Sequence, residues 1–183
     1  MIKYLPVIAL FLVLMTGAFE SHSQVYVGAG YAEAMLSKSG IDDVHGMAIT
    51  IQKPYPFQNR EKWSFDPSLK VCILNSRATQ DFYPAMSTTL GFSPLFSYRL
   101  VGLSWLEISP FVGPYVVWLN WLKGDIDLPT RSTYANEMLY GIEAGLNIDF
   151  KINDKWQIRL TPFSHQWNQD YYRQGVISVA IAL

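Results

Sequence analysis

The sequence is poor in charged residues and in cysteine. Only 16% of its 183 residues are Asp, Glu, Lys or Arg, against about 25% in an average soluble domain. This shortage argues against an ordinary water-soluble globule. The single cysteine, Cys72, precludes an internal disulfide and stands outside any zinc or redox motif. A formal net charge of −1 without a Lys/Arg cluster argues against nucleic acid as a partner.

Long apolar runs are also scarce, and the one present lies at the amino terminus. Lys3 precedes a nearly continuous apolar run from Tyr4 to Phe19, and the small residues Ser21 and Ser23 follow it. This pattern is typical of a secretory signal peptide, so we predict a signal peptide at 1–23 and one mature domain at 24–183. The alternative is a membrane anchor, but a run of about 16 residues interrupted by Pro6 is shorter than the roughly 20 residues a spanning helix needs. If the chain crosses a membrane outside this run, it must do so with strands.

Alternation with a period of two residues dominates the mature chain and is clearest from Met138 to Phe150. Even-numbered residues there are mostly large and apolar, whereas Gly141, Glu143, Gly145, Asn147 and Asp149 form the other face. A helix would mix these two sets because its period is 3.6 residues. The segment is therefore predicted to be a strand with two different faces.

Eight such segments can be distinguished, and they predict an all-β fold, an eight-stranded antiparallel up-and-down transmembrane barrel. About 20 residues per strand and connection suit strands that cross a bilayer at a tilt. Asn153-Asp154 is predicted to be a tight turn at one end, and Gly124 to Asn136 a long loop at the other. Pro54 to Lys62 fits less well because it is long for a turn. The predicted strands are Val25–Leu36, Val44–Lys53, Trp63–Ile73, Thr89–Arg99, Pro110–Leu122, Met138–Phe150, Lys155–His165 and Gly175–Leu183.

Side-chain size predicts which face of the strands points outward. A lipocalin-like soluble barrel would show the same alternation with the apolar face inside. Large residues such as Phe92, Tyr140 and Phe150 gather on one face and small residues on the other, and an eight-stranded barrel has little interior space. We therefore expect the large apolar face to meet lipid and to carry no Asp, Glu, Lys or Arg. Aromatic residues near strand ends are expected at the lipid headgroups; they are Trp63, Tyr115, Trp121, Trp156 and Tyr171.

Two stretches resemble a known family. They are Leu90-Gly91-Phe92-Ser93-Pro94-Leu95-Phe96-Ser97-Tyr98-Arg99 and Pro110-Phe111-Val112-Gly113-Pro114-Tyr115. These stretches are similar to the paired fourth and fifth strands of small outer-membrane barrels of the porin/PorT-like group. The resemblance implies a barrel in the bacterial outer membrane. That family usually ends in an aromatic residue recognised during membrane insertion, whereas this sequence ends in Leu183, so we expect less efficient insertion.

Charged residues of the predicted strands lie on the small-residue face, which would point into the lumen. They are Asp66, Lys70, Arg99, Glu143, Asp149 and Arg159. Buried charges require partners, and Glu143 and Arg159 lie on neighbouring strands, so we expect these two to pair. Asp66, Lys70 and Arg99 would complete the network. A structural network that stiffens the barrel is favoured over a gate or substrate site.

Enzymatic and metal-binding signals are weak. Ser164-His165 faintly resembles the His-x-Ser-Asn region of lipid A deacylase barrels, but Trp167 occupies the serine position. Adjacent strand residues point to opposite faces, so Ser164 and His165 are not expected to form a base–nucleophile pair. His45 and His165 are isolated, and no cofactor or metal is expected.

The sequence thus favours a non-enzymatic outer-membrane barrel with a packed polar lumen and a structural or surface-interaction role. The alternatives are a deacylase-like enzyme of the outer leaflet and a secreted lipocalin-like binder of a small ligand. Expected partners are outer-membrane lipid and an extracellular or envelope component. The candidate contact loops are Ser37–Asp43, Asn75–Phe82, Gly124–Asn136 and Trp167–Arg173, with Asp125, Arg131, Tyr171 and Tyr172 as possible contact residues.

Overall fold

The computed structural model describes residues 24–36, 41–58, 60–76, 86–124, 132–153, 156–168 and 172–183. The predicted signal peptide and the candidate contacts Asp125, Arg131 and Tyr171 lie outside the described residues, and the side chain of Tyr172 does too. Across the described ranges, no helix is long and apolar enough to cross a membrane.

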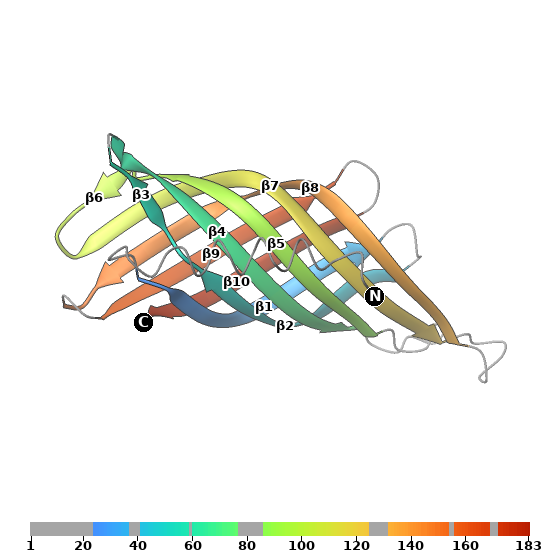
Figure 1. Ribbon diagram of the computed structural model, residues 1–183. Coiled ribbons are helices and arrows are strands. Elements are labelled where there is room, and N and C mark those ends of the chain that lie inside the picture. The colour runs from blue at the N-terminus through green and yellow to red at the C-terminus, as the bar shows by residue number, and fades with distance from the viewer. Residues whose placement is uncertain are drawn as a thin grey trace.

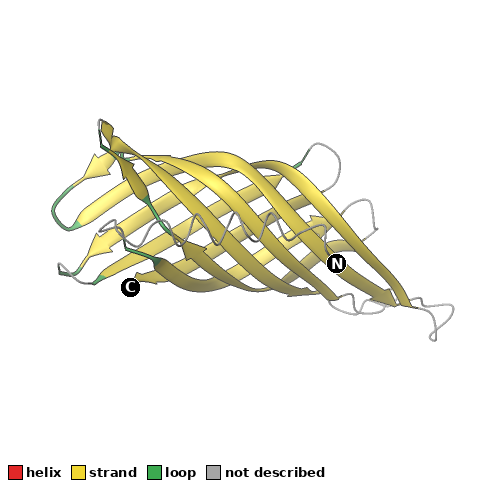
Figure 2. Ribbon diagram, in the orientation of Figure 1, coloured by secondary structure: helices red, strands yellow, loops and turns green. Residues whose placement is uncertain are grey.

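Eight long strands form the wall of a barrel, and Figures 1 and 2 show how they wrap around it. Each long strand pairs in antiparallel fashion with its sequence neighbours, and β1 pairs with β10, which closes the sheet. The predicted eight-stranded antiparallel barrel is therefore confirmed. The long strands are β1 (Tyr26–Leu36), β2 (Ile41–Gln52), β4 (Arg60–Asn75), β5 (Met86–Tyr98), β7 (Leu106–Gly124), β8 (Ser132–Lys151), β9 (Gln157–Trp167) and β10 (Tyr172–Ala182).

Two short strands extend the barrel wall at the end that carries Val25 and Leu183, here called the terminal end. β3 (Tyr55–Phe57) pairs with the beginning of β4, and β6 (Val101–Gly102) pairs with the beginning of β7. The segment Pro54 to Lys62, which fitted a simple turn poorly, thus continues the β2–β4 hairpin beyond the barrel body. Both hairpins rise around the mouth of the barrel (Figure 1).

The opposite end, here called the loop end, is dominated by a long hairpin. The β7–β8 ladder runs from Leu106–Phe150 to Gly124–Ser132. Its length corrects the prediction of a loop from Gly124 to Asn136, because β8 already begins at Ser132. β9 ends at Trp167, opposite Ile142, so Ser132–Gly141 pairs only with β7 among the described strands. We call Val117–Gly124 with Ser132–Gly141 the β7–β8 extension; it projects furthest at the loop end (Figure 1).

The predicted sidedness is confirmed by side-chain exposure. Tyr140 is 78% exposed on the outside, whereas Glu143 on the same strand is fully buried in the lumen. Apolar side chains such as Ile49, Phe96 and Ile177 are likewise exposed on the outer face. A band of exposed apolar side chains around a closed sheet is the surface expected to face hydrocarbon.

Three expectations about individual side chains were wrong. Glu33 lies on the outer face of β1, between Tyr31 and Met35, so that face does carry a charge. Tyr115 is buried in the lumen and Trp121 packs against the buried cluster there, rather than at the headgroups. The alternation of β7 is ambiguous because both of its faces are apolar, and only its pairing with neighbouring strands sets which face points inward.

Glycine makes room for the large residues inside the lumen. A Cβ added at Gly145 would lie 2.4 Å from Cζ of the Phe111 ring, which faces it across the β7–β8 pair. The Phe111 ring therefore fits in the lumen because its neighbour has no side chain. Trp63 and Trp156 remain exposed near the terminal end, as expected for interfacial aromatic residues.

Candidate functional site: the lumen and its terminal mouth

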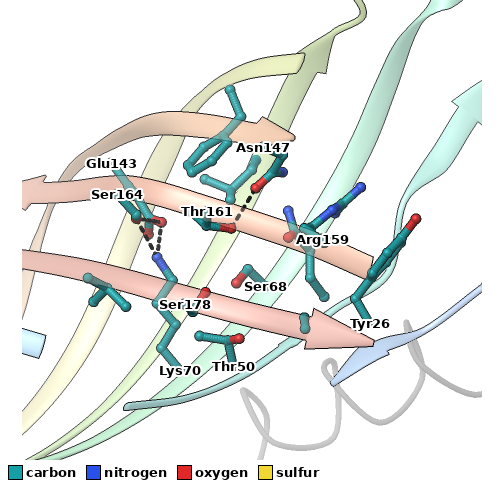
Figure 3. A pocket seen from close by; sticks show the side chains of 15 residues that line it. Tyr26, Thr50, Ser68, Lys70, Glu143, Asn147, Arg159, Thr161, Ser164 and Ser178 are labelled. Carbon is teal, nitrogen blue, oxygen red and sulfur yellow. Dashed lines mark hydrogen bonds and ion pairs between the residues drawn. The ribbon is translucent and has the colours of Figure 1, made fainter. Parts of the chain in front are cut away.

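A buried ion pair occupies the middle of the lumen. Lys70 of β4 and Glu143 of β8 form a salt bridge across the barrel, with 7% and 0% of their side-chain surface exposed. Lys70 Nζ also donates to Ser164 Oγ at 2.7 Å, and Ser164 Oγ donates to Glu143 Oε1 at 2.7 Å (Figure 3). Ser93 and Gln166 donate to Glu143 Oε2 at 2.5 and 2.7 Å. We call these five residues the lumen plug.

A second ion pair lies nearer the terminal end. Nε and Nη2 of Arg159 each donate to an oxygen of Asp149 at 2.7 Å, which is a bidentate arrangement. The guanidinium also lies over the ring of Tyr26, 3.8 Å from its centroid, as a cation–π contact. The predicted Glu143–Arg159 pair is therefore wrong. Strand register explains the error, because Arg159 lies opposite Asp149 whereas Glu143 lies opposite Gln166.

The remaining charged residues predicted for the lumen occupy different sites. Asp66 is buried and accepts a hydrogen bond from Ser97 through Oδ2. Arg99 follows the end of β5 and lies at the terminal mouth, where it is 34% exposed and its Nη1 is 3.8 Å from Glu107 Oε2. The six predicted residues thus all lie in or at the lumen, but in separate groups rather than one network.

The lumen is packed at its centre and in its loop-end half. A cavity of only about 20 Å³ remains between the lumen plug and Arg159, which is room for about one water molecule. Toward the loop end, Val44, Leu74, Tyr115, Leu119 and other buried apolar residues form one cluster. Tight packing is the expected state of an eight-stranded barrel, and it leaves no wide path for solutes.

A larger cavity, which sequence reasoning missed, lies at the terminal mouth. Its volume is about 410 Å³, and we call it the terminal vestibule. Lys62, Glu107 and Lys151 line it, beside the predicted residues Arg99 and Asp66. The only signal in the sequence was their position at or beyond the ends of strands that meet at one end of the barrel. The β3 hairpin also contributes to the wall, through Pro54 and Pro56.

The structure separates Ser164 from His165, and it groups no metal-binding cluster among the described residues. Ser164 is buried in the lumen whereas His165 is exposed on the outside, so these side chains point to opposite faces, as predicted. The described residues contain no group of three or more His, Cys, Asp or Glu side chains placed to hold a metal. Cys72 is buried, and Gln174 Nε2 lies 2.9 Å from its sulfur.

Two bacterial proteins of known structure align with most of this chain. Neisserial surface protein A aligns with a TM-score of 0.59 at 11% identity, covering 89% of this chain and 97% of that one. Ail, the attachment invasion locus protein of Yersinia pestis, aligns with a TM-score of 0.54 at 10% identity, covering 88% and 98%. Its complex with the heparin analogue sucrose octasulfate aligns with a TM-score of 0.53 at 11% identity, with the same coverage.

This chain has the outer-membrane β-barrel fold. At identities near 10% the likeness concerns the fold, and the outward apolar band supplies the independent physical reason for a transmembrane barrel. No protein-family model matches the chain, and a search of curated proteins finds no match. The narrower porin/PorT-like assignment therefore stays a prediction. In barrels of this type the short turns face the periplasm and the long loops face the exterior.

Proposed function

We propose that this protein is an exported, non-enzymatic barrel of the bacterial outer membrane that acts at the cell surface through its loop end. The single observation that carries this proposal is the packed lumen, in which the plug and the apolar cluster leave no wide route for solutes. A barrel that is closed to solutes has its two ends as the surfaces available for specific contacts. The signal peptide at 1–23 would direct the chain to the envelope.

The β7–β8 extension is the described surface best placed for such contacts. On its outer face, Tyr134 donates a hydrogen bond to Asn120 Oδ1 at 2.8 Å, and Trp118 Nε1 donates to Asn136 Oδ1. These cross-strand bonds stiffen the two strands. A firm scaffold that carries exposed tyrosine, and whose β8 edge has no partner among the described strands, is suited to contacting another polypeptide.

The charge of the loop end bears on the class of partner. The four candidate loops together contain six aspartates and four lysines or arginines, with Asp125, Arg131, Tyr171 and Tyr172 among their possible contact residues. The Yersinia pestis protein Ail was solved in complex with a heparin analogue, which is highly anionic. An excess of acidic residues disfavours polyanions, so we propose a protein or neutral glycan partner for this chain.

Cell fractionation and surface labelling test this proposal. We expect a heat-modifiable band in the outer-membrane fraction, and cleavage within Gly124–Asn136 by a protease added to intact cells. A soluble extracellular or periplasmic product would instead support the lipocalin-like alternative. Changed lipid A acylation in a deletion strain would support the deacylase-like alternative, although Ser164 and His165 lie on opposite faces of β9.

A further inference from the structure

The terminal vestibule has the dimensions of a small-molecule site. Its volume is about 410 Å³, and pockets for small ligands measure about 300–1,000 Å³. Tyr26 and Arg159 line both this cavity and the much smaller one behind it, and Figure 3 shows them on the wall of the smaller one. Beyond them only that small cavity, of about 20 Å³, remains before the plug. A solute entering from the terminal end would therefore be held in a blind chamber rather than conducted.

Positive charge is in excess on the vestibule wall. The lining includes four cations, Lys62, Arg99, Lys151 and Arg159, but only three carboxylates, Asp66, Glu107 and Asp149. A small charged solute in this chamber would meet that excess at short range, where screening by salt is incomplete. The charge balance favours an anion.

Two of the vestibule's cations lie at its mouth, around one carboxylate oxygen. Glu107 Oε2 lies 3.8 Å from both Arg99 Nη1 and Lys151 Nζ. This separation exceeds normal hydrogen-bond length, so two cations share one anion without a direct hydrogen bond to it. Arg99 and Lys151 remain about one-third exposed. An anionic group at this point could accept hydrogen bonds from both cations.

The inner wall presents two buried polar atoms without a hydrogen-bond partner in the structure. They are Nη1 of Arg159 and Oδ1 of Asp66, and both residues line the vestibule and have less than 5% of their surface exposed. Buried polar atoms without partners are rare in proteins, and bound water or ligand commonly satisfies them. Arg159 Nη1 can donate to an oxygen, whereas Asp66 Oδ1 can accept from a hydroxyl.

We propose that the terminal vestibule binds a small soluble organic anion, one that carries a carboxylate or phosphate together with hydroxyl groups. Arg99 and Lys151 bind the anionic group at the mouth, and the hydroxyl groups reach the inner wall at Arg159 and Asp66. This site faces the periplasm and is separate from the proposed contact surface at the loop end. Binding at this site goes beyond the proposed surface role. If the binding experiment fails, the proposed surface role is unaffected.

Calorimetric titration of the folded protein isolated from membranes tests the site. The probe is glycerol 3-phosphate, which has both groups, and glycerol is its uncharged counterpart. In low-salt, phosphate-free buffer we expect saturable binding of glycerol 3-phosphate and none of glycerol. The double variant Arg99→Gln/Lys151→Gln should lower the affinity by at least about tenfold, which corresponds to about 1.4 kcal/mol.

Arg60→Gln is the control, because Arg60 is an exposed cation at the same end that does not line the vestibule. We expect its affinity to stay within about twofold of the unmodified protein, a difference well below 1 kcal/mol. Heat-modifiable migration would show that each variant is folded. Absence of saturable binding at millimolar probe, or an equal loss in the control, would overturn the proposal.

A lipid headgroup offers the same chemistry, so the titration is repeated in nanodiscs of phosphatidylcholine with and without phosphatidylglycerol. Unchanged affinity in both supports a soluble ligand. Loss of binding only when phosphatidylglycerol is present would assign the cations to a headgroup and overturn the proposal as stated.

Discussion

Lys70 and Glu143 lie 73 residues apart in sequence and form a buried ion pair across the lumen. The pair joins β4 to β8, which are not neighbours in the sheet, so it links opposite parts of the barrel wall. Three further polar side chains supply hydrogen bonds to Glu143 or Lys70. We interpret the lumen plug as an internal cross-brace.

Removing one charge of the pair should destabilise the barrel strongly. We expect Glu143→Leu to lower the free energy of unfolding by about 3–5 kcal/mol, because it leaves the Lys70 ammonium buried and unpaired. The double variant Lys70→Met/Glu143→Leu should lose much less, since both charges are gone. Urea unfolding of the refolded protein in lipid vesicles measures these differences. Equal losses in the single and double variants would show that the pair is not the source of the effect.

Arg159 should stabilise the barrel through its shape as well as its charge. We expect Arg159→Lys to lower the melting temperature, because lysine keeps the charge but cannot make the bidentate contact with Asp149. Arg159→Ala should lower it further, since Asp149 would then be buried without its cation. Circular dichroism during heating gives both values, and Arg60→Gln provides an exposed control. A melting temperature unchanged in Arg159→Ala would contradict the structural role.

The barrel should not conduct, even without its plug. In planar bilayers we expect no large steady conductance from the unmodified protein. Lys70→Ala/Glu143→Ala should also remain closed, because Leu74, Tyr115 and Leu119 still fill the loop-end half of the lumen. Single-channel recording distinguishes the possibilities. Stable openings in the double variant alone would show that the plug is a gate instead of a brace.

The outer face should respond to charge according to depth in the bilayer. Ile177 lies at the middle of β10 and is 52% exposed, so Ile177→Lys should cost about 2–4 kcal/mol. Glu33 lies three residues from the loop end of β1, and Glu33→Leu should therefore change stability by at most about 1 kcal/mol, in the stabilising direction. Vesicle unfolding measures both changes. A large loss on replacing Glu33 would indicate a specific polar partner at that position.

Much of the fold was predictable because a barrel strand follows one local rule: successive side chains point alternately to the lipid and to the lumen. From Met138 to Phe150, mostly large apolar residues alternate with mostly small or polar ones, and that pattern alone indicated the strand and its lipid-facing side. The strand count and the sidedness of the wall followed from the same rule. It failed at Tyr115 and Trp121, where both faces of β7 are apolar and the local pattern does not distinguish inside from outside.

The sequence by itself determined that charged side chains such as Glu143 and Arg159 point inward, because residue type and strand period together set the face. Only the tertiary structure decided which partners they meet. Arg159 is paired with Asp149 by the register of β9 against β8, and Glu143 meets Lys70 because the closed sheet brings β4 across from β8. The terminal vestibule likewise depends on the closed barrel bringing residues of β3, β4, β7, β8 and β9 together at one mouth. Pairing across a lumen depends on the closure of the sheet and on the register of its strands, and the local alternation of residues specifies neither.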